Sequence, residues 1–457
     1  MPPNREPISL ILRQNTFGPT GAKYLASALE ANAPIHYLDL RENSGIKDKG
    51  IEDIALSLSN NTILTGIDLI KCGCDQLGAD ALARALMSNH TMLTLLLQDP
   101  LSNGAIDSLG SLLSDPKCSL QTLYLWKCQL NQESLELLCR SLRSNTSLQT
   151  LALSYNFIND NAAIYISDMI YRNKSLTKLQ LGANRFNPPS AGFFGVALAK
   201  NDTLKFLDLS RNSLRSVGVW PLAVALLNNK TLETLDLRYN MIDPEGINFF
   251  CELISGNSAI NVLKLSGNNF NDESISLLAK KLARNTTIKE IELNEVGMTS
   301  VSFAALCNAL QMNNTLQRIS LNKNNLTANA LAAFANLLKV NTSLLFVGMS
   351  ECEIDDCGAM YIAEGITSNS SLNELDLSKN RIFVDGIRAI SDAVMGNYSL
   401  MKINLKNNPF ISVEQSNYND CHYNGDIADF LERNNYYLHN LLMKDMGELA
   451  KEKCFYT

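Results

Sequence analysis

The segment Leu232-Glu233-Thr234-Leu235-Asp236-Leu237-Arg238-Tyr239-Asn240 decides the fold of this chain. Its residues follow the pattern Leu-x-x-Leu-x-Leu-x-x-Asn, and the alternation in its second half predicts a short strand. Asp243 can then cap a helix, and Pro244 suits the first turn of that helix. The apolar residues that follow have helical spacing, at Ile247, Phe250, Cys251 and Ile254. One strand followed by one helix is therefore the predicted unit.

This unit recurs along nearly the whole chain. The last position of successive copies is Asn15, Asn43, Cys72, Pro100, Cys128, Asn156, Asn184, Asn212, Asn240, Asn268, Val296, Asn324, Cys352, Asn380 and Asn408. Thirteen of the fourteen intervals are 28 residues, and the interval from Asn43 to Cys72 is 29. A fixed period with this leucine spacing is typical of a leucine-rich repeat solenoid.

The predicted fold class is α/β, a leucine-rich repeat solenoid in the form of a horseshoe. Parallel strands should line the concave face and helices the convex face, because strands stack about 4.8 Å apart whereas helices need about 8–10 Å. We expect residues 1–457 to form a single domain of about 15 repeats, since a repeat buries its apolar face only against its neighbours.

The C-terminal end departs from the repeat. We predict an inserted loop at 409–424, then a partial sixteenth strand and a capping helix at 438–453. Asp420, Cys421 and His422 in this loop have side chains that can bind a metal. A structural zinc site usually needs four ligands, and only one Cys and one His are local, so we expect a solvated polar loop and no metal.

Two columns of asparagine mark the two turns of each unit. The first is the repeat-end column given above, where a stacked Asn can satisfy backbone groups of its own turn and of the adjacent one. Cys can fill the same space and donate weakly, whereas Pro100 and Val296 cannot, so we expect looser or rerouted turns there. The second column follows the helix, and because Asn tolerates the left-handed conformation we expect it to end the helix that way.

Composition limits the classes of function. Lys and Arg number 39 against 46 Asp and Glu, so the net charge is −7 and a dedicated nucleic-acid binder is disfavoured. No apolar stretch is long enough to span a membrane, and the first residues lack the apolar core of a signal peptide. The 11 cysteines are an odd number, which favours reduced thiols in a cytoplasmic protein. Ten Asn-x-Ser/Thr sequons fall in the second asparagine column, so we interpret them as structural.

No catalytic motif is present, so we expect no enzyme activity and no cofactor. The four histidines have no obvious nucleophile beside them. Carboxylates recur on the predicted strands at Asp39, Asp68, Asp208, Asp236 and Asp376. They could act as paired acids, but each belongs to the repeated strand motif, which favours a structural role.

The 28-residue unit, with Leu-x-Leu-x-x-Asn/Cys followed by an Ala/Leu-rich helix, resembles the ribonuclease-inhibitor-like class of leucine-rich repeats over about residues 7–445. That class also includes the Ran GTPase-activating protein, tropomodulin-type caps and the sensor domains of NOD-like receptors. The resemblance implies the fold and leaves the function open. The alternatives to a binding scaffold are a GTPase-activating or other enzyme-regulatory protein, and a microbial effector or NOD-like-receptor-type sensor.

The predicted function is a non-catalytic intracellular scaffold, monomeric, that binds a protein partner on the concave face. Aromatic and basic residues that flank the strand leucines are the residue types that dominate binding hot spots. The predicted protein-binding residues are Tyr124, Trp126, Lys127, Tyr155, Phe206, Arg211, Arg238 and Tyr239.

Overall fold

The computed structural model describes residues 8–409, which fall into two compact units. The N-terminal unit extends to Ile242 and includes Gly256–Ile260. The C-terminal unit comprises Asp243–Ser255 and continues from Asn261. Both are built from the same alternating strands and helices.

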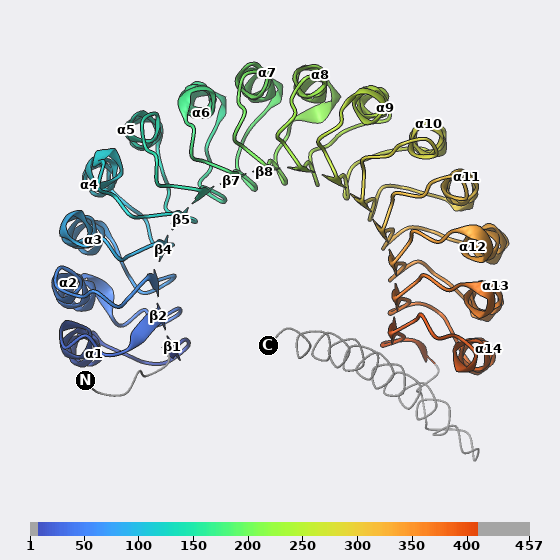
Figure 1. Ribbon diagram of the computed structural model, residues 1–457, viewed down its shortest axis with the longest axis horizontal. Helices are drawn as coiled ribbons and strands as arrows, with labels where there is room; N and C mark the ends of the chain where they lie inside the picture. Colours follow the sequence, from blue (N-terminus) through green and yellow to red (C-terminus); the bar gives the residue numbers. More distant parts are fainter. Residues whose placement is uncertain (1–7, 410–457) are drawn as a thin grey trace, which may run out of the picture. The chain divides into compact units, whose positions relative to one another are not determined.

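The N-terminal unit contains nine parallel strands in sequence order, with the register set by the repeat, as in Leu207↔Leu235. The strands are β1 Ile8–Ile11, β2 Ile35–Asp39, β3 Gly66–Asp68, β4 Thr94–Leu97, β5 Thr122–Leu125, β6 Thr150–Ala152, β7 Lys178–Gln180, β8 Phe206–Asp208 and β9 Thr234–Asp236. The helices are α1 Pro19–Glu30, α2 Lys47–Leu58, α3 Gln76–Ser88, α4 Asn103–Ser114, α5 Gln132–Leu142, α6 Asp160–Arg172, α7 Pro188–Leu198 and α8 Arg215–Leu226. Within this unit the strands lie on the concave side and the helices on the convex side (Figure 1).

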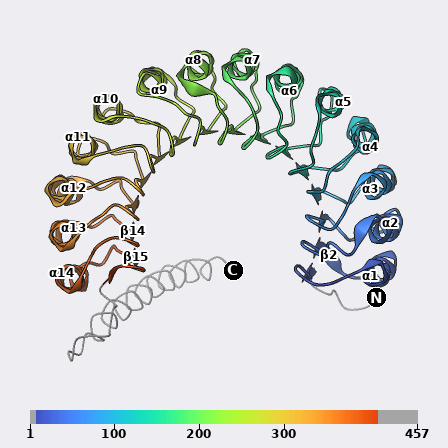
Figure 2. The same ribbon diagram turned by 180° about the vertical axis from the view of Figure 1, so that it is seen from behind.

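The C-terminal unit repeats the arrangement, again with helices outside and parallel strands inside (Figure 2). Its strands are β10 Val262–Lys264, β11 Glu290–Glu292, β12 Arg318–Ser320, β13 Phe346–Gly348, β14 Glu374–Asp376 and β15 Lys402–Asn404. Its helices are α9 Gly246–Gly256, whose last residue belongs to the N-terminal unit, α10 Asp272–Leu282, α11 Ser300–Leu310, α12 Ala328–Val340, α13 Asp356–Ser368 and α14 Val384–Met395.

The core of each unit lies between the strand layer and the helix layer. Strand leucines such as Leu235 and helix residues such as Ile247 and Phe250 are almost fully buried. Asp243 accepts a hydrogen bond of 3.0 Å from the N–H of Glu245 in the turn just before α9, which begins at Gly246. The predicted leucine-rich repeat solenoid is therefore confirmed, with strands on the concave face and helices on the convex face of each unit.

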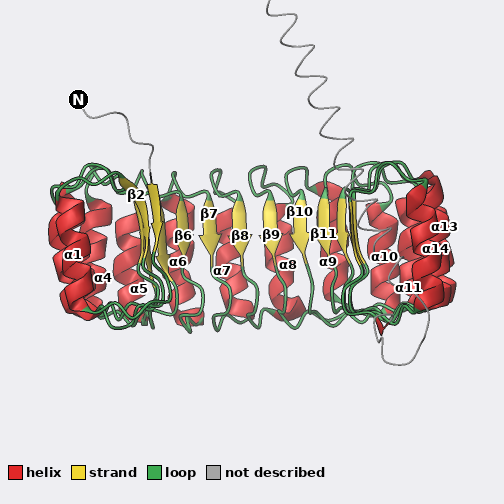
Figure 3. Cartoon of the chain, turned by 90° about the horizontal axis from the view of Figure 1, so that it is seen from below, coloured by secondary structure: helices red, strands yellow, loops and turns green. Residues whose placement is uncertain are grey.

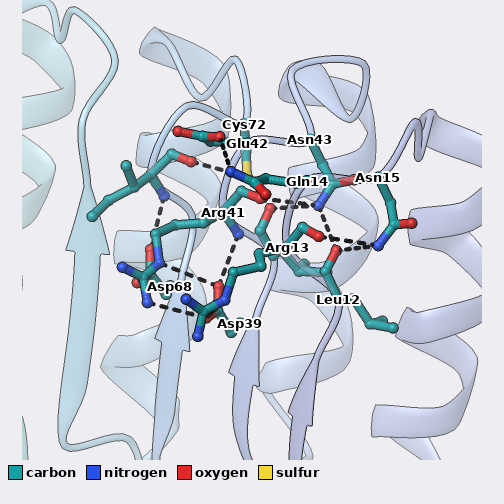
Figure 4. A network of polar contacts seen from close by, with 12 residues as sticks. Leu12, Arg13, Gln14, Asn15, Asp39, Arg41, Glu42, Asn43, Asp68 and Cys72 are labelled. Carbon is teal, nitrogen blue, oxygen red and sulfur yellow. Dashed lines mark hydrogen bonds and ion pairs between the residues drawn. The ribbon is translucent and has the colours of Figure 1, made fainter. Parts of the chain in front are cut away.

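The first asparagine column forms a hydrogen-bonded ladder, which we call the turn ladder. The Nδ2 of Asn43 donates to the carbonyl of Leu40 in its own turn, at 2.7 Å, and to that of Leu12 in the preceding turn, at 2.9 Å (Figure 4). The Oδ1 of Asn184 accepts from the N–H groups of Asn156 and Ile158 in the preceding repeat, at 3.0 and 3.1 Å. The predicted dual role of these amides is thus confirmed.

Cysteine at a ladder position keeps the donor half of this role. The Sγ of Cys72 lies 3.0 Å from the carbonyl oxygen of Leu40, and the Sγ of Cys352 lies 3.3 Å from that of Leu321. The corresponding distance from Cys128 to Leu97 is 3.7 Å. As predicted, the thiol fills the buried space and donates weakly.

The two exceptional turns behave differently from each other. The residue before the ladder position has a left-handed backbone in the regular turns, and Glu295 keeps it with φ 53°. The turn at Val296 is therefore not rerouted, because the fully buried valine fills the space of the asparagine. Asp99, the residue before Pro100, does not have this left-handed backbone. A residue that precedes proline is restricted to extended conformations. Of the looser or rerouted turns predicted at these two places, the turn at Pro100 is rerouted as predicted, whereas the turn at Val296 keeps the regular backbone course.

The second asparagine column forms another ladder, which we call the helix-end ladder. The Nδ2 of Asn173 donates to the carbonyls of Leu142 and Asn145 in the preceding repeat, at 2.7 and 3.2 Å. Its Oδ1 accepts from the N–H groups of Ser175 and Leu176. The predicted left-handed mechanism is wrong for this residue, whose φ is −68°, because the side chain rather than the backbone conformation satisfies the helix end.

In this second column only Asn32 has a positive φ, of 53°. The predicted turn role therefore holds, although its cause is hydrogen bonding. The ten sequon asparagines of this column are buried, as the structural interpretation requires. Two further sequons begin at Asn60 and Asn325, outside the column, and both of these residues are exposed.

Some predictions lie outside the described residues. The loop at 409–424 with its candidate metal ligands falls there apart from its first residue, and so do the sixteenth strand and the capping helix at 438–453. The expectation of a single domain over 1–457 stays a prediction.

Candidate functional site

The predicted binding residues all lie in the N-terminal unit, in two rows. Figure 3 shows turns along both edges of the strand layer, one where the strands begin and one where they end. Tyr124 and Phe206 belong to strands β5 and β8. Trp126 and Arg238 follow strands β5 and β9. Lys127, Tyr155, Arg211 and Tyr239 have left-handed backbones in the turns where the strands end.

The structure brings three of these residues together. The rings of Trp126 and Tyr155 meet edge to face, with centroids 5.5 Å apart and an interplanar angle of 73°. The Nζ of Lys127 lies 5.2 Å from each ring centroid. An ammonium group over an aromatic face is stabilised by the ring quadrupole. The three side chains therefore support one another, while Tyr155 remains 39% exposed and Trp126 is half-buried.

Two further cation–π pairs extend the site. The Arg211 guanidinium lies 4.4 Å from the centroid of Tyr239. The Nζ of Lys178, on strand β7, lies 4.9 Å from the ring of Phe206 on strand β8. Each pair links adjacent repeats, because its members are 28 residues apart in the sequence.

Sequence reasoning missed Phe157 and Arg185. The ring of Phe157 is 58% exposed, and the Arg185 guanidinium lies 4.6 Å from its centroid. Two signals could have found them: this position is polar or glycine in most repeats, and the two residues are again 28 apart. We use the name aromatic edge for Trp126, Lys127, Tyr155, Phe157, Arg185, Arg211 and Tyr239.

Arg238 has a different environment from the other predicted cations. Its guanidinium binds the buried carboxylate of Asp236, with Nε 2.9 Å from Oδ1, and the same oxygen accepts from the N–H of Arg238 at 3.1 Å. Asp39 likewise accepts from the N–H of Arg41. The strand carboxylates thus satisfy a backbone donor just after the strand, which supports their structural role.

The first three repeats share a charged network (Figure 4). Asp39 lies between Arg13 and Arg41, at 3.2 and 3.1 Å, and the Nε of Arg41 is also 2.9 Å from Asp68. Burial is the largest cause that raises the pKa of Asp68, and repulsion from Asp39 adds to it. Burial followed by repulsion from Asp236 raises the pKa of Asp208. Asp39 and Asp68 are neighbours in register on adjacent strands, and so are Asp208 and Asp236. Each of these carboxylates also accepts a hydrogen bond from a backbone N–H in its own repeat.

The strand face of the C-terminal unit combines ion pairs with one cation–π pair, in which the Arg318 guanidinium on β12 lies 4.1 Å from the ring centroid of Phe346 on β13. The Nζ of Lys264 lies 2.5 Å from Glu292, and the Nε of Arg318 lies 3.6 Å from Glu290. The charges within these two pairs therefore neutralise one another within the unit.

The nine described cysteines are all unpaired, and Cys357 is the exposed one among them. Burial raises the pKa of Cys139 and of Cys352 to about 12 and that of Cys251 to about 11. Within residues 8–409, no group of three or more His, Cys, Asp and Glu side chains is placed to hold a metal ion. None of the helices in this range has the length and apolarity that a membrane span requires.

Comparisons with known proteins agree with this architecture. The Leucine Rich repeat family matches residues 31–55, 144–167, 228–251 and 368–391. Mouse ribonuclease inhibitor is 33% identical over 123 residues, which are 26% of this chain and 27% of the inhibitor. Mouse NACHT, LRR and PYD domains-containing protein 14 is 30% identical over 141 residues, which are 30% of this chain and 14% of that protein. The matches thus span a small part of these relatives.

Among solved structures, the crystal structure of the Rad7 and Elc1 complex in yeast aligns with a TM-score of 0.48 and 17% sequence identity, over 81% of this chain and 86% of that chain. The repeat period and the two asparagine ladders make this chain a leucine-rich repeat solenoid, and its matched segments are similar to ribonuclease inhibitor.

Proposed function

We propose that this protein is a non-catalytic scaffold that binds a protein partner through the aromatic edge and the adjoining concave strand face. The observation that carries the proposal is the contact of Trp126, Tyr155 and Lys127, whose rings and ammonium group remain partly exposed on the strand side. Trp, Tyr and Arg are the residues most enriched at the centres of protein interfaces.

The frame of the aromatic edge favours binding without a large entropic cost. The turn ladder fixes the backbone on either side of Tyr155, since Asn156 donates to the carbonyls of Leu125 and Leu153. A preformed surface loses little freedom on association, so more of its contact energy appears as affinity.

The relatives support a binding role. Ribonuclease inhibitor is named for its action on an enzyme, and 123 of its residues align with this chain at 33% identity. We extend only this general mode to the present chain, and we leave the identity of the partner to experiment.

We also propose that the protein acts as a monomer in the cytoplasm. The buried unpaired cysteines support a reducing compartment. Intact-mass measurement of protein from its source cell should give the unmodified mass with free thiols, and sedimentation should give a single 50.4 kDa species. A glycosylated or dimeric protein would contradict this part.

Affinity capture from the source cell's lysate tests the binding proposal. The wild type is compared with a Trp126→Ala/Tyr155→Ala variant and with a Trp220→Ala/Tyr24→Ala control. Trp220 and Tyr24 are 55% and 76% exposed on helices of the same unit, so the control removes the same two residue types from the helix side. We expect one protein to be captured by the wild type and the control but not by the test variant. Equal capture by all three would refute the aromatic edge as the binding site.

A further inference from the structure

A basic hollow lies in the N-terminal unit where helices end and strands begin, at the opposite edge from the aromatic edge. It has a volume of about 790 Å³ and is lined by Arg143, Ser144, Tyr171, Arg172, Lys174 and Lys200. Four of these six residues are cationic and none is acidic. The hollow spans the C-terminal ends of α5, α6 and α7, so three consecutive repeats contribute to it.

One carboxylate holds both guanidinium groups of this hollow. The Nε of Arg172 donates to the Oδ1 of Asp168 at 2.8 Å, and the Nε of Arg143 lies 2.5 Å from the Oδ2 of the same residue. The Arg143 contact lacks hydrogen-bond geometry and is an ion pair only. Because the closest nitrogen of each guanidinium is its Nε, the terminal nitrogens remain available to a ligand. Two planar forks are thereby oriented before any ligand arrives.

The two lysines add charge around these forks. Lys174 and Asp202 form an exposed ion pair of 2.6 Å, which is easily exchanged for another anion. Lys200 is exposed and makes no ion pair with any residue in 8–409. Tyr171 is 48% exposed and belongs to the lining of the hollow.

Neutralisation of helix dipoles does not explain this cluster. Cations near a helix C-terminus are favourable, so a basic last turn could be a general feature of the repeat. However, six of the eight helices of the N-terminal unit, α1 to α4, α7 and α8, have no basic residue in the last turn. Lys174 and Lys200 also lie beyond the last residues of α6 and α7. The charge is therefore concentrated at this place rather than distributed with the period.

We infer that the basic hollow binds a small ligand that carries two or more phosphate groups. Guanidinium forks match phosphate oxygens in pairs, and lysine supplies mobile point charges. The volume lies in the range of small-molecule sites and exceeds what one phosphate fills. A nucleic acid is disfavoured because the chain as a whole carries a net charge of −7.

Isothermal titration with sodium tripolyphosphate at low ionic strength tests this site on the full chain. We expect saturable binding of one anion that weakens at least about 10-fold in Arg143→Gln/Arg172→Gln, because this variant loses both guanidinium forks and two positive charges. Lys174→Gln/Lys200→Gln should also weaken it, by about 3-fold or more. Arg172→Lys should fall between the wild type and the double arginine variant, because it keeps the charge and loses the fork.

The control is Lys280→Gln/Lys281→Gln, which removes the same charge from the exposed face of α10 in the other unit. It should bind like the wild type. Absence of saturable binding to the wild type would overturn the inference. Equal weakening by the control would also overturn it, because the effect would then be one of net charge. Binding of a single-stranded RNA oligonucleotide without binding of tripolyphosphate would reassign the hollow to nucleic acid.

Discussion

The carboxylate of Asp99 accepts a hydrogen bond of 2.9 Å from the backbone N–H of Cys74. In a regular turn this task belongs to the ladder asparagine of the next repeat, as Asn184 shows for Ile158. Pro100 occupies that place in the fourth repeat and has neither a side-chain amide nor an N–H. The neighbouring residue therefore supplies the acceptor. In a regular turn the ladder asparagine of the next repeat also donates to a carbonyl, as Asn184 does to Leu153. Pro100 cannot donate to the corresponding carbonyl of Leu69, which instead accepts from the N–H of Cys72 at 3.2 Å.

Asp99→Ala should destabilise the third and fourth repeats by about 1–3 kcal/mol, because it leaves buried N–H groups without an acceptor. Asp99→Asn should cost much less, since its Oδ1 can still accept. Burial raises the pKa of Asp99, so loss of the charge also removes a desolvation cost. Hydrogen exchange of peptides that cover the Cys74 turn, together with the urea midpoint, measures the effect. Equal losses for the two variants would contradict the acceptor role.

Two substitutions of Asn184 distinguish the stabilisation from its donated hydrogen bonds from that of its accepted hydrogen bonds. Asn184→Leu removes both and should destabilise the chain by roughly 1–3 kcal/mol. Asn184→Cys should cost less, because cysteine occurs naturally at three ladder positions and keeps a donor. Chemical denaturation of the two variants and the wild type under reducing conditions measures this order. A leucine variant as stable as the wild type would refute the ladder as a source of stability.

The fold was predictable because every repeat contains two independent signals, one for the strand and one for the helix. Each strand presents one buried leucine face, and each helix an apolar stripe, so the 28-residue period sets both the order of elements and the strand register. The chemistry of Asn and Cys likewise predicted the turn ladder at Asn43 and Cys72. The hydrogen-bond partners of these side chains lie either in the same turn or in the adjacent repeat, so the repeat pattern locates them.

The remaining features depend on backbone geometry that a residue pattern does not contain. The helix-end role of Asn173 was predicted from its conformational tolerance, but its side chain forms the hydrogen bonds. Val296 was expected to disturb its turn, but a buried apolar side chain of suitable volume is tolerated there. Phe157 and Arg185 were missed because strand alternation does not extend into the turns, where the left-handed residues re-aim the side chains.

Phe157 offers a test of the aromatic edge that is independent of Trp126. Phe157→Ala should weaken binding of the captured partner by more than about 1 kcal/mol, as expected for a central aromatic contact. The melting temperature should change little, because more than half of the ring is exposed. Tyr24→Ala, on α1, is the matched control. Unchanged affinity, measured by titration calorimetry, would restrict the site to the other residues of the aromatic edge.

Asp208→Asn should stabilise the protein at neutral pH by about 0.5–2 kcal/mol. Burial and then repulsion from Asp236 raise the pKa of Asp208 above its ordinary value of 3.8. The folded chain therefore binds more protons than the unfolded chain in the window just above that value, and stability falls as pH rises through it. The amide can still accept from the N–H of Ser210, which donates to Asp208 at 2.8 Å. The gain should disappear below about pH 3.8.

Asp376→Asn is the control for this effect. It has the same Leu-Asp-Leu-Ser sequence and the same hydrogen bond from Ser378, at 2.9 Å. Its neighbours in register are Gly348 and Asn404 instead of a carboxylate. Urea unfolding from pH 4 to 8 should therefore show a larger gain for Asp208→Asn. Equal gains would assign the effect to burial alone rather than to the adjacent charge.

The thiols should fall into two kinetic classes. The thiolate is the reactive form, and burial raises the pKa of thiols such as Cys139 and Cys352 to about 12, so these should react slowly in the native protein. Cys357 is the exposed cysteine of the described residues, and Cys357→Ser should remove one equivalent of fast-reacting thiol. In denaturant without reductant, all 11 cysteines of the wild type should react. An unchanged fast phase in Cys357→Ser would place that side chain in the core, and a shortfall in denaturant would reveal disulfides.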